Sequence, residues 1–199
     1  DGEPVTTNDL AARLGVTAAS ASSMVKKLAE LDLVDHVPYR GVTLTAAGQR
    51  VALEVMRHHR LLELYLAEHL GVPWDQVHEE AEALEHHISE DLEARIAEKL
   101  GNPTHDPHGD PIPSVELEID EGETRALESL AIGDRARFVR ISDSDPEMLR
   151  YLEQRGIRLG DEFELVERQP FDGPLTLRFG GGNEIVGGQL AGSMRVELV

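Results

Sequence analysis

The chain has 199 residues, which is enough to bury a real core and to hold one large or two small domains. It contains no cysteine, which excludes disulfides, thiolate metal sites and cysteine nucleophiles. No apolar run reaches the length of a membrane span and no signal peptide is visible, so we expect a soluble, cytoplasmic protein. Asp1 is not a natural start, and we expect a further segment upstream of it.

The net charge of −19 argues against nucleic-acid binding, but the charge is not evenly distributed. Residues 1–60 are neutral, residues 61–113 carry −11 and residues 114–199 carry −8. A DNA-binding head needs only local phosphate contacts and a close approach to the bases. Charge alone therefore leaves DNA binding open.

Residues 6–48 predict a helix, a turn, a second helix and a short hairpin. N-cap residue types at 7–9 precede the first helix, and Gly15 ends it. Thr17 caps the second helix, whose apolar residues recur at helical spacing. Residues 33–45 then predict two strands around a tight turn.

This order is typical of a winged helix-turn-helix, in which the second helix enters the major groove of DNA. Its Ser and Lys side chains can donate to phosphates, and its small alanines allow a close approach to base edges. It has no Arg, Asn or Gln, so we expect readout to depend partly on methyl contacts and DNA shape. An ordinary surface helix is the alternative. The predicted DNA contacts are Thr17, Ala18, Ala19, Ser20, Ser22, Ser23, Lys26, Lys27 and, on the wing, Tyr39 and Arg40.

The next zone is helical. One helix is predicted from near Gln49 to Leu70, where Gly71-Val72-Pro73 breaks it, and a second starts near Asp75. A third runs from Ser89, its N-cap, to Leu100. The proline-rich stretch 102–114 follows as a linker or an ordered loop.

Histidine is concentrated in this zone, since eight of the nine lie between residues 58 and 108. His59 and Glu63 are four residues apart on one helix, and residues four apart share a helix face. His78, Glu82 and His86 of the next helix are also each four residues apart. The short connection between the two helices brings the two sets together. Solvated polar residues on acidic helices are the alternative. The six predicted ligands are His59, Glu63, His78, Glu82, Glu85 and His86, while His58, His69, His87, His105 and His108 are expected at the surface.

Imidazole and carboxylate ligands without sulfur suit Mn(II), Fe(II), Zn(II) or Co(II) and disfavour Cu(I). In this arrangement Glu82 and Glu85 could bridge two ions. The sequence therefore predicts a metal centre between two helices.

The last zone, residues 114–199, predicts a small β-barrel with one helical turn at 146–154. Its short alternating runs are separated by glycine-rich stretches. The predicted strands are 115–119, 136–141, 162–167, 175–179 and 194–198.

Catalytic motifs are missing from the sequence. It has no glycine-rich phosphate loop, no nucleophile elbow and no HExxH motif, so we expect that the chain is not an enzyme. Two other functions remain open beside DNA regulation: a metal-buffering or storage protein without specific DNA binding, and a binuclear metallohydrolase.

Taken together, these segments resemble the iron- and manganese-dependent repressors typified by the diphtheria toxin repressor and the manganese transport regulator. The strongest matches are residues 55–63 (VMRHHRLLE) and 77–89 (VHEEAEALEHHIS). The wing 39–45 (YRGVTLT) and the exit 109–113 (GDPIP) also match, and residues 125–199 are similar to the SH3-like domain of ferrous-transport accessory proteins.

The resemblance implies two metal sites. Glu82, Glu85 and His86 match the primary or bridging ligands, and His59, Glu63 and His78 match the neighbouring set. Long-form repressors add ligands from the SH3-like domain, which implies Glu147 first and Asp143 or Asp145 second.

The chain departs from the iron-type pattern in two places. Iron-type members have Cys where this chain has Glu82, and the harder carboxylate favours Mn(II), with Fe(II) remaining open. An anion site of iron-type members uses an Arg that matches Arg60, but its other partners align with Asp106 and Asp110, so the resemblance does not extend to the whole of that site. The family also takes a ligand from its first helix, which would precede Asp1.

We therefore expect an α+β protein with a winged helix-turn-helix domain at 1–48, a helical metal-binding and dimerisation domain at 49–113 and an SH3-like β-barrel at 114–199. The expected function is a metal-dependent transcriptional regulator, most simply a repressor of metal-ion homeostasis genes. It would bind a pseudo-palindromic operator as a homodimer and hold two Mn(II) or Fe(II) ions per chain.

Overall fold

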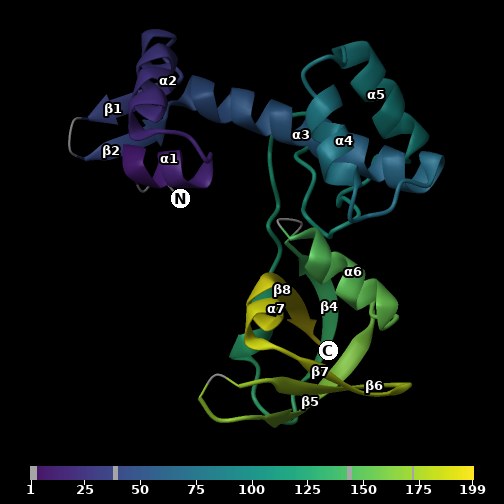
Figure 1. Cartoon of the computed structure of the whole chain (residues 1–199). Helices are drawn as coiled ribbons and strands as arrows, with labels where there is room; N and C mark the ends of the chain where they lie inside the picture. Colours follow the sequence, from purple (N-terminus) through teal and green to yellow (C-terminus); the bar gives the residue numbers. More distant parts are fainter. Residues whose placement is uncertain (1–3, 38–39, 143–144, 172) are drawn as a thin grey trace. The chain divides into compact units, whose positions relative to one another are not determined.

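The computed structural model describes residues 4–37, 40–142, 145–171 and 173–199. The chain forms two compact units, one ending at Val55 and the other beginning at Met56. Figure 1 labels their helices and strands.

The first unit begins with the predicted helix pair and hairpin. Thr6 and Thr17 are the N-caps, and each side-chain oxygen accepts from the backbone N–H three residues later. Val25 packs with Val34 and Val42 in a small core, so the hairpin lies against the second helix. The elements are α1 (Thr7–Arg13), α2 (Ala18–Glu30), β1 (Val34–Val37) and β2 (Gly41–Leu44), with β1 and β2 antiparallel.

Gly48 fixes how the next helix follows the hairpin. A Cβ at this position would lie 1.9 Å from the carbonyl oxygen of Leu33, so only glycine allows the close approach. Thr45 caps this helix start, because its Oγ1 accepts from the Gly48 N–H and donates to the carbonyl of Asp32.

Three helices follow the hairpin: α3 (Ala46–Leu70), α4 (Val77–Leu84) and α5 (Glu90–Lys99). Helix α3 begins in the first unit and continues into the second, which contains α4 and α5. Their core contains Leu61 and Leu62 of α3, Val77 and Ala81 of α4, and Ile96 of α5. Because the apolar face of α3 packs on α4, the polar residues beside that face are brought next to α4 as well.

Helix α4 is shorter than expected. It ends at Leu84, residues 85–87 form a turn, and the N–H of His87 donates to the carbonyl of Leu84. Ser89 takes an extended backbone to cap α5, so the chain leaves the α4 helix before it. His86 therefore does not share a helical stripe with His78, contrary to the expected spacing.

The proline-rich stretch is an ordered loop rather than a linker. Gly109 has φ +84, and a Cβ there would lie 2.0 Å from the carbonyl oxygen of Val139. The N–H of Ile141 donates to the carbonyl of His108. The loop is thus held against strand β4 (Arg135–Ile141).

The remainder is a six-stranded antiparallel sheet with the order β3-β8-β4-β5-β6-β7. Phe138, Leu165, Leu177 and Val196 lie at the centre of its core. No pairing closes β3 onto β7 in the described residues, so the predicted barrel is an open sheet. The other elements are β3 (Arg125–Ala126), η1 (Leu127–Ser129), α6 (Pro146–Gln154), β5 (Glu162–Arg168), β6 (Leu175–Phe179), β7 (Gly182–Val186), α7 (Gly188–Ser193) and β8 (Met194–Leu198).

Four of the five predicted strands are present, and 115–119 is not one of them. Leu117 has φ +62, and the Ser114 hydroxyl accepts from the N–H groups of Glu116 and Glu118. These local bonds fold the segment into a turn despite its alternating pattern. The observed elements confirm the α+β class, and none of the described helices is both long and apolar enough to span a membrane.

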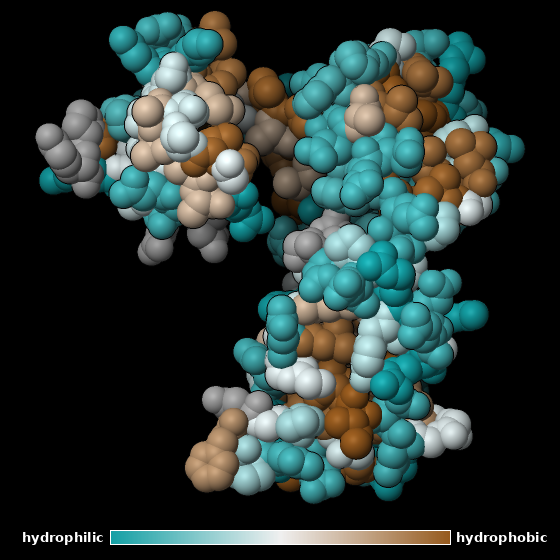
Figure 2. Space-filling view, viewed as in Figure 1, coloured by the Kyte–Doolittle hydropathy of each residue, from teal (hydrophilic) through white to brown (hydrophobic). Residues whose placement is uncertain are grey.

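On the face shown in Figure 2, hydrophilic residues predominate and hydrophobic residues form separate islands between them. This surface agrees with the high content of Asp and Glu.

Candidate metal centre and nucleic-acid interface

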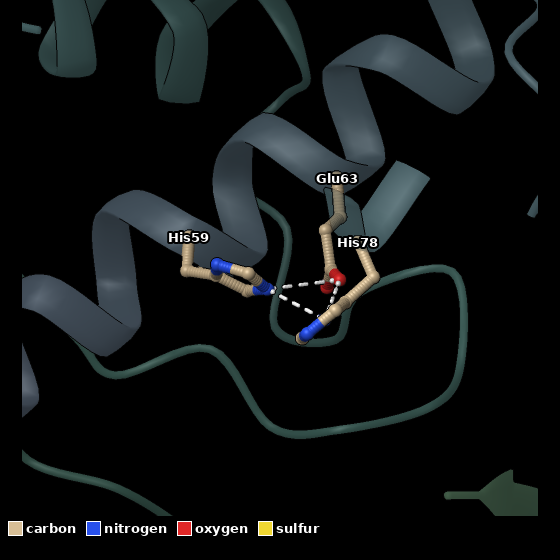
Figure 3. A group of neighbouring side chains, drawn as sticks. All are labelled: His59, Glu63 and His78. Carbon is tan, nitrogen blue, oxygen red and sulfur yellow. Dashed lines mark hydrogen bonds and ion pairs between the residues drawn. The ribbon is translucent and has the colours of Figure 1, made fainter. Parts of the chain in front are cut away.

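Three predicted ligands converge where α3 faces α4. His59 and Glu63 come from successive turns of α3, and His78 comes from the first turn of α4 (Figure 3). His59 Nε2 lies 3.0 Å from Glu63 Oε1 and 3.1 Å from His78 Nδ1. His78 Nδ1 also lies 3.2 Å from Glu63 Oε1. One atom of each side chain therefore faces a common point, which is the arrangement needed to hold an ion.

Glu85 holds the other side of the His59 ring. Its Oε2 lies 2.6 Å from His59 Nδ1, and its Oε1 lies 3.3 Å from His86 Nε2. A carboxylate on Nδ1 fixes the tautomer and the orientation of an imidazole whose Nε2 serves as ligand. Glu85 thus connects His59 to His86.

The structure does not bring Glu82 to this cluster. Its side chain is exposed, and it makes no hydrogen bond or ion pair with any described residue. His86 is also exposed, and its ring meets Glu85 alone among the described carboxylates. Of the predicted primary set, only Glu85 lies in direct contact with His59.

Burial and mutual attraction shift the protonation of the cluster. Burial lowers the pKa of His59, but the hydrogen bonds and charges of Glu63 and Glu85 outweigh it and raise the pKa to about 9. Burial raises the pKa of Glu63, yet attraction to His108 and His59 brings it down to about 2. At neutral pH the metal-free cluster therefore holds an ionised Glu63 carboxylate beside a protonated His59 imidazole.

A second group of ligands shares Glu63. Glu63, Asp106 and His108 are all buried, and one ligand atom of each lies within 4.8 Å of the others. His108 Nε2 hydrogen-bonds to the carbonyl of Trp74, whereas its buried Nδ1 has no hydrogen-bond partner and lies 3.8 Å from Glu63 Oε2. A buried nitrogen that makes no hydrogen bond and faces a carboxylate fits a ligand better than a packing residue.

The expected surface position of His108 is wrong, since it is fully buried, and so is that of His58, which is 7% exposed. His69, His87 and His105 are exposed, as expected. His108 and Asp106 gave no signal at helical spacing, because they lie on the ordered loop. Their only sequence cue was their place in the stretch that resembles the family's exit from the dimerisation domain.

The residues around Arg60 do not fit an anion site. Arg60 lies 3.8 Å from Asp106 and 3.6 Å from Asp110, and Asp110 lies 2.5 Å from Arg140 of β4. Burial, and then the charges of Asp110 and Glu63, raise the pKa of Asp106 to about 7. Carboxylates of the chain itself already occupy the position beside the guanidinium, so a bound anion would be repelled.

Two of the expected ligands from the last domain, Asp145 and Glu147, are not gathered at either group. Asp145 is the N-cap of α6 and accepts from the N–H of Glu147, whose side chain is exposed. Neither belongs to a group of ligand atoms within the described part of the chain. Asp143 lies outside the described residues.

The predicted DNA contacts that the structure describes are all exposed, and they lie on α2 and the wing of the first unit. Ala21 and Val25 turn the buried face of α2 inward, while Ser20, Ser22, Ser23, Lys26 and Lys27 are exposed. Thr17, Ala18 and Ala19 are exposed at the helix start, and Arg40 is exposed on the wing. Tyr39 lies outside the described residues.

Family models match three successive stretches of the chain. The iron-dependent repressor N-terminal DNA-binding domain matches residues 1–42. The iron-dependent repressor metal-binding and dimerisation domain matches residues 45–114, and the FeoA domain matches residues 125–198.

Similar proteins cover nearly the whole chain. The diphtheria toxin repressor of Corynebacterium glutamicum is 30% identical over 96% of this chain and 86% of its own length. The iron-dependent repressor IdeR of Mycobacterium tuberculosis is 31% identical over 96% of this chain and 87% of its own.

Solved structures of metal-dependent regulators have the same fold over nearly the whole chain. A manganese-dependent transcriptional repressor in complex with manganese is 43% identical, has a TM-score of 0.92 and covers 98% of this chain and 91% of its own. ScaR with bound Zn²⁺ is 28% identical, has a TM-score of 0.84 and covers 99% and 93%.

These relatives are repressors, which supports a transcriptional regulator over a metal-buffering protein. The matched DNA-binding, metal-binding and dimerisation, and FeoA models follow one another along the chain. The chain belongs to the iron-dependent repressor family, whose members are metal-dependent, DNA-binding regulators of metal homeostasis.

Proposed function

We propose that this chain is a repressor activated by Mn(II), with Fe(II) as the alternative ion. The observation that carries the proposal is the convergence of His59, Glu63 and His78, with a second ligand group on the other oxygen of Glu63. The donors are nitrogen and oxygen without sulfur, which suits both ions. The 43% identical repressor with bound manganese supports Mn(II).

We propose two ions for each chain, and different observations favour the ligands of each. His59, Glu63 and His78 would hold the first. For the second, the resemblance implies Glu82, Glu85 and His86, whereas burial and ligand convergence favour Glu63, Asp106 and His108. Glu63 would then bridge the two ions through its two oxygens. Asp143, Asp145 and Glu147 remain weaker candidates from the last domain.

The side chains would divide the work at the first site. Glu85 orients the His59 ring through Nδ1, so that Nε2 faces the ion. Glu63 and His78 supply the neighbouring donors and join α3 to α4. A bound divalent ion supplies positive charge that offsets the buried carboxylates. Ion binding would then stabilise one arrangement of these helices. If that arrangement is the one that binds DNA, ion binding and DNA binding are coupled.

The DNA-binding side of the proposal rests on the first unit. We propose domains at 1–48, 49–113 and 114–199, the second of which forms a homodimer. A two-fold dimer would present two copies of α2 to a pseudo-palindromic operator. Lys26, Lys27 and Arg40 would contact phosphates, and residues 17–23 would approach the bases. We assign no catalytic step to the chain, and place it with the chromosome in the cytoplasm.

Fluorescence anisotropy with promoter fragments tests this proposal. Titrations with Mn(II), with Fe(II) under anaerobic conditions and with Zn(II) should show the tightest DNA binding at saturating Mn(II). Lys26→Ala should weaken binding to all sequences alike, whereas Lys99→Ala, an exposed lysine of α5, should not. Equal DNA affinity in chelator and in Mn(II) would refute the sensor.

A further inference from the structure

Helix α3 carries a second histidine, His58, beside His59. Its side chain is 9% exposed, and its Nε2 is buried without a hydrogen-bond partner. Consecutive residues of a helix point about 100° apart, so His58 faces α5 rather than α4. His58 therefore lies outside the ligands around Glu63 that we propose as the regulatory centre, which are His59, Glu63, His78, Asp106 and His108.

Two carboxylates of α5 flank this nitrogen. Glu93 Oε2 lies 3.0 Å and Glu90 Oε1 lies 3.5 Å from His58 Nε2. Neither contact has the alignment of a hydrogen bond. Glu54 of α3, one turn before His58, completes the group, since one ligand atom each of Glu54, His58 and Glu90 lies within 4.8 Å of the others. Imidazole and carboxylate donors therefore surround one point, as they do around a bound ion.

Glu93 is held as a metal ligand usually is. Its Oε1 accepts from Arg57 Nε at 2.7 Å, and Arg57 also donates to the carbonyl of Pro113. This support leaves Oε2 directed at His58, and the guanidinium offsets one of the carboxylate charges. A divalent ion would offset the remaining negative charge of the carboxylates.

Glu90 is the exposed ligand, on the solvent side of the site. Its side chain is 73% exposed, whereas those of His58 and Glu93 are each 9% exposed. Two donors are therefore fixed by packing, and Glu90 can rotate over an ion that arrives from solvent.

We propose that His58 and Glu90, with the neighbouring carboxylates of Glu54 and Glu93, form a further site for a divalent transition-metal ion, which links α3 to the first turn of α5. The imidazole favours an ion such as Zn(II) or Mn(II) over Ca²⁺ or Mg²⁺, which prefer oxygen ligands alone. The site lies within the proposed dimerisation domain, and its ion fastens that domain independently of the regulatory centre.

The test is the number of Zn(II) ions bound per full-length chain after equilibrium dialysis, measured by mass spectrometry. His58→Gln and Glu90→Gln should each bind one ion fewer than the wild type at micromolar Zn(II), with affinity at that site reduced at least about tenfold. Glu98→Gln, which removes another exposed carboxylate of α5, should keep the full count.

His59→Gln separates this site from the proposed regulatory centre. In that background, Zn(II) should still raise the melting temperature, and adding His58→Gln should reduce the increase. Because Glu90 is exposed, Glu90→Gln tests the site even if the buried substitution prevents folding. An unchanged ion count in both His58→Gln and Glu90→Gln would overturn the proposal.

Discussion

At the scale of single residues, Glu63 links the two ligand groups. Its Oε1 faces His59 and His78, while its Oε2 faces His108, and the side chain is 1% exposed. A carboxylate buried this deeply needs compensating charge, which the metal-free chain provides with protonated imidazoles. Ion binding therefore exchanges protons for metal.

This exchange predicts the direction of the pH dependence. The pKa of both His59 and His108 is raised to about 9. Burial alone would lower both values, and the net rise comes from Glu63, aided by Glu85 at His59 and by the Trp74 carbonyl and Asp106 at His108. Both rings are therefore protonated at pH 7, and Mn(II) must displace their protons. Apparent Mn(II) affinity should rise between pH 6.5 and 8.5 by up to about tenfold per pH unit for each proton displaced. Calorimetry in buffers of different ionisation enthalpy measures the protons released.

His105→Gln, at an exposed position, should leave this slope unchanged. A Mn(II) affinity that stays constant over the range would contradict the proton exchange.

Trp74 can report where the second ion binds. It is the only tryptophan, and its ring stacks on His108 with 6.1 Å between centroids. Paramagnetic Mn(II) at Glu63, Asp106 and His108 should quench its fluorescence strongly, and His108→Gln should remove most of that quenching. Quenching that survives in His108→Gln and disappears in His86→Gln would instead place the ion at Glu82, Glu85 and His86.

Residue spacing predicted part of this centre and missed the rest. His59 and Glu63 lie together because one helix fixes their separation, and a short connection sufficed to bring His78 near them. Asp106 and His108 lie on a loop whose shape depends on its contact with β4, far along the sequence. Local periodicity carries no information about such a contact.

At the scale of secondary-structure elements, caps and apolar spacing predicted most boundaries. Thr17 and Ser89 were identified as N-caps, and both side chains accept the expected bond. The end of α4 at Leu84 and the turn at 115–119 were not predicted, because each depends on a local side-chain or capping geometry that competes with the hydrophobic pattern. Helix α2 is the element whose position matters most for DNA.

Thr17→Ala removes the N-cap of α2. Thr17 Oγ1 accepts from the N–H of Ser20 at 3.1 Å, and loss of this bond should lower the free energy of unfolding of the first unit by about 1 kcal/mol. Chemical denaturation followed by circular dichroism measures the change. Thr17→Ser keeps the hydroxyl and should restore most of the stability, while the number of bound Mn(II) ions should be the same in all three proteins. Equal stability of the Ala and Ser variants would contradict the capping role.

At the scale of the whole molecule, charge is the dominant feature. The net charge is −19, yet the first 60 residues are neutral. Repulsion among the acidic residues opposes the compact state, whereas the neutral head can approach DNA. Salt therefore acts on this protein in two ways, on its stability and on its phosphate contacts.

Raising NaCl from 0.1 to 1 M shortens the screening length from about 10 Å to about 3 Å, and this should raise the melting temperature of the metal-free chain. A variant with Glu98, Glu116 and Glu123 changed to Gln, all at exposed positions, should respond less. Differential scanning calorimetry measures both. A melting temperature that falls with salt in the wild type would show that favourable ion pairs outweigh the repulsion.

The central claim is that the ligands around Glu63 control DNA binding. The most direct measurement is the Mn(II) concentration that half-saturates binding of the full-length protein to promoter DNA, for the wild type and for Glu63→Gln, with Glu98→Gln as the matched control. The substitution keeps the shape of the side chain and removes its charge. We predict that Glu63→Gln requires at least about a hundredfold more Mn(II), while Glu98→Gln behaves as the wild type. Half-saturation at the same Mn(II) concentration in all three proteins would contradict the account.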